Sequence, residues 1–205
     1  MRPGLVVRAA SRGVSRRFVL ALAATWIAFC VLRLASLPLL YPYQVTDGIL
    51  DSGLVVGLVL PVAVGSRVLV EADFPPTRTA VRPLAGDRLF WAAVALLVSV
   101  VGSSLVAWTN AGASLSVLAA GLLLASLGLL GVGLLGAHGQ WAVPLAVAFV
   151  ASVPDLVPAR WNVLYLTSAS GQVLLLSGVV LAVSLPIYAR SGSTGVVPRP
   201  GRDDL

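Results

Sequence analysis

The chain has 205 residues, of which 58% are hydrophobic and only 11% are charged, and its mean hydropathy is +0.96. A soluble domain carries about 25% charged residues, so this chain has too few polar groups to cover its surface, which indicates a membrane protein. All 14 basic residues are arginine, which excludes lysine-dependent chemistry such as a Walker A phosphate loop or a Schiff base. Because Cys30 and His138 are the single cysteine and the single histidine, we expect no intramolecular disulfide, no metal site and no cofactor.

Six apolar runs are long enough to cross a bilayer core about 30 Å thick, which needs about 20 helical residues. They cover residues 18–41, 52–70, 89–109, 114–136, 141–157 and 171–189. The first run is longer than the apolar part of a signal peptide and is not followed by an A-x-A cleavage site, so we interpret it as a retained helix. The sequence therefore predicts an all-α, polytopic membrane protein in which residues 18–189 form one transmembrane domain of six helices.

The arginines are divided unequally between the two sides of this predicted domain. In chain order, one side has 5, 4, 0 and 3 arginines near the membrane, and the other side has 0, 0 and 1. Short cytoplasmic loops collect positive charge, so we predict a plasma-membrane protein with both termini in the cytoplasm. Residues 1–17 form a basic amphipathic arm that would lie on the inner leaflet, and residues 190–205 are predicted to be a disordered tail.

Arg33 lies well inside the first predicted span. A charge at the centre of a membrane helix costs about 2.5–3.5 kcal/mol, and less where the side chain reaches the interface. Asp47 and Asp51, in the following outer loop, are the carboxylates available to pair with it. We predict an ion pair that ties the first span to the second. The alternative is an arginine that snorkels to the interface and has no further role.

The stretch between the fifth and sixth spans combines turn-forming, aromatic and apolar residues. A plain surface loop would be more polar, whereas tryptophan and tyrosine are typical of a membrane interface. We therefore predict a re-entrant or interfacial segment that enters the outer leaflet between residues 154 and 166. The residues that characterise it are Pro154, Asp155, Pro158, Arg160 and Trp161.

Small residues are dense in the last three spans, and three pairs of them have a spacing of four residues. Such pairs let helices approach closely, and we expect them to pack within the chain, with a dimer face as the alternative. The pairs are Gly121 with Ala125, Gly133 with Ala137, and Gly178 with Ala182. This wealth of small and aliphatic residues, with arginine in place of lysine, is typical of a GC-rich, actinobacterial-like genome.

The most polar stretch of the chain is the inner loop that joins the second and third spans, residues 71–88. Five of its six charged residues are the candidate contacts for a partner, namely Glu71, Asp73, Arg78, Arg82 and Arg88, and the sixth is Asp87. The loop resembles the cytoplasmic coupling segment of type-2 ABC transporter permeases, in which an acidic residue ends the second helix and a segment with arginine and proline leads into the third. The resemblance extends in outline to the basic N-terminal arm, the six spans and the outer segment before the sixth. The loop differs in its Pro75-Pro76 pair and in lacking a Gly-Thr/Ser-x-Glu run.

The resemblance implies a non-enzymatic permease subunit of an exporter, energised by a separate ATP-binding subunit that contacts these five candidate residues. It also implies a homo- or heterodimer in the lipid bilayer, and we expect no nucleic-acid partner. Two alternatives stay open. One is a non-catalytic membrane scaffold or assembly protein, for which the loop is a solvated connector. The other is a membrane enzyme that acts on lipid, for which the outer charged residues Arg33, Asp47, Asp51, Asp155 and Arg160 would have to serve.

Overall fold

The computed structural model describes residues 14–34, 50, 52–70, 85–108, 114–152, 157 and 162–194. Every regular element in these ranges is a helix, so the predicted all-α class is confirmed for them. The elements are α2 (Arg16–Leu34), α3 (Ser52–Gly65), η1 (Ser66–Leu69), α5 (Ala85–Trp108), α6 (Ser114–Leu135), η2 (Gly136–His138), α7 (Gly139–Ser152), η4 (Thr167–Ala169), α8 (Ser170–Ser191) and η5 (Gly192–Thr194).

Each of the six predicted runs contains an α-helix, but the helix ends differ from the prediction. Three helical runs are long and apolar enough to cross a membrane, namely Ala85–Trp108, Ser114–Ser152 and Thr167–Ser191. The second of these is 39 residues long and consists of two helices, α6 and α7, that fold back on each other. The run Gly53–Leu69 is apolar but shorter. These helices are those of a membrane-associated protein.

The C-terminal end of the described chain is more ordered than the sequence indicated. α8 extends through Ser191, and η5 continues the chain to Thr194. The structure thus contains five residues of the predicted tail, 190–194, because Gly192 and Ser193 are buried against the bundle. Residues 195–205 and residues 1–13 of the predicted arm lie outside the described residues.

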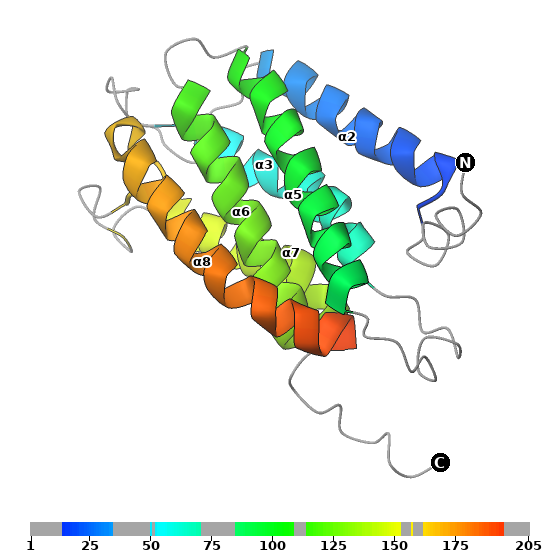
Figure 1. Ribbon diagram of the computed structural model, residues 1–205. Helices are drawn as coiled ribbons and strands as arrows, with labels where there is room; N and C mark the ends of the chain where they lie inside the picture. Colours follow the sequence, from blue (N-terminus) through cyan, green and yellow to red (C-terminus); the bar gives the residue numbers. More distant parts are fainter. Residues whose placement is uncertain are drawn as a thin grey trace.

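Successive helices run in alternate directions between two ends of the bundle (Figure 1). At one end, Tyr188 of α8 belongs to an apolar cluster with Leu69, at the end of η1, and Trp91, near the start of α5, and Phe18 from the start of α2 packs against it. At the other end, the amide of Leu50, just before α3, donates to the carbonyl of Tyr165, just before α8. We call these the Tyr188 end and the Tyr165 end.

α6 is the central helix and contacts α3, α5, α7 and α8 (Figure 1). Fourteen of its 22 residues are buried. Small residues permit this position: a Cβ added to Gly121 would lie 2.0 Å from Ser103 Oγ, and one added to Gly133 would lie 2.9 Å from Ile187. The predicted internal packing is thus confirmed at these two glycines. It is wrong for Gly178 of α8, which faces open space because α8 turns this side away from the bundle.

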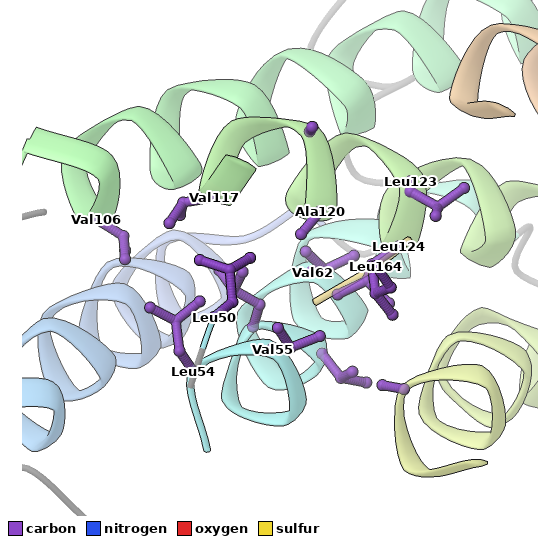
Figure 2. Close-up of a cluster of buried hydrophobic side chains, with 14 of the residues drawn as sticks. Leu50, Leu54, Val55, Val62, Val106, Val117, Ala120, Leu123, Leu124 and Leu164 are labelled. Carbon is purple, nitrogen blue, oxygen red and sulfur yellow. The ribbon is translucent and has the colours of Figure 1, made fainter. Parts of the chain in front are cut away.

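The larger apolar cluster joins elements that are far apart in the sequence. Leu54 and Val55 of α3 meet Val106 of α5, Val117 of α6 and Leu164, which precedes η4 (Figure 2). All five side chains are at least nine-tenths buried. Lipid tails are as apolar as leucine, so in a bilayer such a cluster stabilises the fold by close packing rather than by removal from water.

α6 and α7 form a tight hairpin whose turn is η2, where the predicted fourth span ends. Gly136 has φ 74°, a left-handed conformation that favours glycine. The backbones of Gly131 and Gly139 lie so close that a Cβ on either would be 2.1 Å or less from the carbonyl oxygen of the other. The hairpin therefore depends on glycine at both positions.

Candidate functional site

The structure describes one of the five predicted ATPase-contact residues, Arg88. The other four, Glu71, Asp73, Arg78 and Arg82, lie outside the described residues. We refer to residues 71–84, which join Val70 to α5, as the connection. Its two flanking elements, η1 and α5, contact each other, so the chain leaves the bundle and returns to it at the Tyr188 end.

The other predicted site residues are also mostly outside the described ranges. Arg33 lies in α2, but the structure describes neither its side chain nor the residues Asp47 and Asp51, so the ion pair remains a prediction. The same holds for the characteristic residues of the predicted outer segment, which are Pro154, Asp155, Pro158, Arg160 and Trp161.

Arg88 binds the C-terminal end of α8. Its Nη1 donates to the carbonyl oxygens of Ala189 at 3.0 Å and Arg190 at 2.8 Å. The last four carbonyls of a helix have no intrahelical donor, and a cation near them is favourable because of the helix dipole. In the structure, Arg88 binds α8 of its own chain, and its predicted contact with a partner protein stays a prediction. No charge pattern in the sequence indicates this pairing, since the two groups are about 100 residues apart.

Two further hydrogen bonds hold the same end of α8. The hydroxyl of Tyr188, which is fully buried, donates to the carbonyl of Leu69 at 2.6 Å. Ser191 Oγ donates to the carbonyl of Gly133 at 3.1 Å. Together with Arg88, these side chains tie the end of α8 to η1, α5 and α6. We call Arg88, Tyr188 and Ser191 the α8 clamp. Sequence reasoning missed Tyr188 and Ser191, because a tyrosine and a serine at the end of an apolar run are typical of many interfacial positions.

The described charges gather at the Tyr188 end. Five arginines lie there, and at the Tyr165 end the described residues contribute Arg33 alone. The five are Arg16, Arg17, Arg67, Arg88 and Arg190. The described acidic residue at the Tyr188 end is Asp87, next to Arg88. This end of the bundle is therefore electropositive within the part of the chain that the structure describes.

The Tyr165 end is joined by hydroxyl, amide and backbone groups rather than by charges. The hydroxyls of Ser152 and Tyr165 are hydrogen-bonded to each other, and Asn162 Nδ2 donates to the carbonyl of Ala151 at 2.6 Å. Ser152 and Asn162, the residues that flank 153–161, are therefore both held at the end of α7. Residues 163–165 form a turn, with Leu164 and Tyr165 buried in the core. The re-entrant or interfacial segment between residues 154 and 166 stays a prediction.

Within the described ranges, no group of three or more His, Cys, Asp or Glu side chains is placed to hold a metal ion. No protein family, curated protein or solved structure matches this chain.

Proposed function

We propose that this chain is the membrane subunit of an ABC-type exporter, with a separate ATPase subunit docked on the connection, residues 71–84. In this proposal the chain lies in the plasma membrane, crosses it six times and has both termini in the cytoplasm. It carries out no catalysis itself and works as a homo- or heterodimer.

The observation that carries the proposal is the position of the connection relative to the α8 clamp. Leu69, two residues before the connection, accepts the hydrogen bond from Tyr188. Arg88, four residues after it, donates to the last turn of α8. A protein that binds the connection would consequently act on α3, α5 and α8 together, which is what an ATPase needs in order to move a membrane subunit.

The alternating helix directions and the charges support the proposed topology. With six crossings in alternate directions, the start of α2 and the end of α8 fall on the same side of the membrane, and in the structure both lie at the Tyr188 end. This end also holds the five arginines Arg16, Arg17, Arg67, Arg88 and Arg190. Because cytoplasmic segments collect arginine, we assign the Tyr188 end to the cytoplasm.

The packing around α6 favours a substrate path between two copies of the chain, or between this chain and a paralogue. Within one chain, α6 is surrounded by α3, α5, α7 and α8. The surface of α6 that contacts these helices consists of buried aliphatic and small residues. Closure of the ATPase pair on ATP would rock the two membrane subunits apart and release an apolar or amphipathic substrate outward.

The proposal is tested by affinity purification of the detergent-solubilised protein and identification of the chains that co-purify. The wild type is compared with a variant that carries Arg78→Glu and Arg82→Glu in the connection. A matched control carries Arg16→Glu and Arg17→Glu, which make the same change of charge at the Tyr188 end but outside the connection. We expect a stoichiometric ATPase with the wild type and the control, and its loss from the connection variant.

The second candidate function is a non-catalytic membrane scaffold, which the filled interior around α6 also fits. If no ATPase co-purifies with any of the three proteins in several mild detergents, the exporter proposal is wrong and the scaffold is favoured. If an ATPase binds the connection variant as tightly as the wild type, the docking site lies elsewhere.

A further inference from the structure

α2 lies at the edge of the bundle and packs on α3 (Figure 1). The ring of Phe29 fills the space beside Gly57 of α3, where an added Cβ would meet it, and Leu22 lies near Gly65 of α3. Since the two helices run in opposite directions, these two contacts fix which sides of α2 and α3 face each other.

α5 covers one side of the α2–α3 pair. Trp26 of α2 lies against Gly102 of α5, and Val98 of α5 lies beside Gly65 of α3. The helical period of 3.6 residues identifies the residues of both helices on the opposite side of the pair, away from α5. We call them the outer α2–α3 face, and all are exposed: Arg17, Ala21 and Ala28 from α2, Leu60 from α3, and Arg67 from η1.

Two arginines mark the Tyr188 end of this face. Phe18, next to Arg17, packs against the cluster that contains Val68, next to Arg67, so the two arginines lie at the same level of the bundle. Within the part of the chain that the structure describes, neither guanidinium group has a hydrogen-bond or ion-pair partner. Because like charges repel, an anion between them would be favourable, and guanidinium groups bind phosphate through paired N–H donors.

The rest of the outer α2–α3 face is apolar. Ala21 and Ala28 are exposed, and Leu60 is 62% exposed. Leu60 precedes Arg67 by seven residues, or about 10 Å along the helix axis. In a membrane, an acyl chain would cover this apolar part. A face that is cationic at one end and apolar along its length fits an amphiphile with an anionic headgroup, whereas a free phosphate would contact the arginines alone.

We propose that the outer α2–α3 face binds an anionic phospholipid, with its phosphate between Arg17 and Arg67 and an acyl chain along Ala21, Ala28 and Leu60. This inference goes beyond the proposed function and does not depend on it. An exporter subunit and a scaffold would present the same face to the bilayer.

The test is native mass spectrometry of the full chain in detergent, titrated with phosphatidylglycerol or with phosphatidylcholine that carries the same acyl chains. The test variant carries Arg17→Gln and Arg67→Gln. The matched control carries Arg16→Gln and Arg190→Gln, which remove the same charge from exposed arginines at the Tyr188 end but outside the outer α2–α3 face. A rescue variant carries Arg17→Lys and Arg67→Lys.

We expect the wild type to bind phosphatidylglycerol more tightly than phosphatidylcholine. The affinity for phosphatidylglycerol should fall about fivefold for each arginine removed from the face, and about thirtyfold for the pair. The control and the lysine variant should stay close to the wild type, and the weak binding of phosphatidylcholine should be the same in all four proteins. Should the double glutamine variant fail to fold, the single variants Arg17→Gln and Arg67→Gln decide the matter.

Three results would overturn the proposal. Equal affinity of the wild type for the two lipids would show that the face does not select an anionic headgroup. An equal loss of affinity in the control would show that the positive charge of the whole end attracts the lipid, without a site. Displacement of phosphatidylglycerol by inorganic phosphate in excess would show a site for a free anion.

Discussion

At the scale of single residues, Tyr188 and Arg88 show how polar groups are placed in a chain with few of them. Each is bonded to a backbone carbonyl near the end of a helical segment, where the helix itself offers no donor. A buried carbonyl without a partner is costly, so these long side chains close the helix ends at one end of the bundle.

Removing the hydroxyl of Tyr188 should therefore destabilise the protein. We expect Tyr188→Phe to lower the free energy of unfolding by about 1–3 kcal/mol, because the carbonyl of Leu69 is left buried without this donor. The measurement is unfolding of the protein in mixed micelles, with Trp108→Phe as the control, since Trp108 is 85% exposed. Equal stability of Tyr188→Phe and the wild type would show that water or another group satisfies Leu69.

At the scale of helices, proline changes the hydrogen bonding inside two helices without ending them. Pro61 in α3 and Pro144 in α7 each remove a helical hydrogen bond, and the described part of each helix is 14 residues long. For α7 this is about 21 Å. Pro144 has no amide hydrogen to donate to the carbonyl oxygen of Gln140. That oxygen instead lies close to Gly128 of α6, where an added Cβ would be 3.1 Å from it.

The α6–α7 hairpin should be the element most sensitive to an added methyl group. We expect Gly131→Ala to destabilise the protein by several kcal/mol or to prevent folding, because the Cβ would lie 2.1 Å from the carbonyl oxygen of Gly139 and the backbones must separate. Gly171→Ala is the matched control, since nothing lies within 4 Å of that position. Thermal unfolding in detergent compares the two, and a stable Gly131→Ala protein would contradict the described hairpin.

The sequence was sufficient to locate six apolar helices, because apolar runs and their boundaries are local signals. It could not assign Arg88 to α8, because that contact depends on how the helices pack. The same limit applies to Gly178 and Gly133, which have the same spacing pattern in the sequence but face open space and Ile187, respectively. Local spacing indicates that close packing is possible, and the fold determines where it occurs.

At the scale of the whole molecule, the two ends of the bundle differ in chemistry. The Tyr188 end holds five of the six described arginines and the α8 clamp, while the Tyr165 end is joined by hydroxyl, amide and backbone groups. The connection returns to the electropositive end, between η1 and α5. This polarity is the basis for assigning a cytoplasmic partner to the Tyr188 end.

The central claim, that an ATPase docks on the connection, is tested most directly by photo-crosslinking in native membranes. A photoreactive phenylalanine analogue replaces Ala80 in the connection or, as the control, the exposed Trp108 near the Tyr165 end. We expect the probe at residue 80 to form a crosslink to a nucleotide-binding subunit and the probe at residue 108 to form none. A probe at residue 80 that captures only lipid, or a protein without a nucleotide-binding site, would contradict the claim.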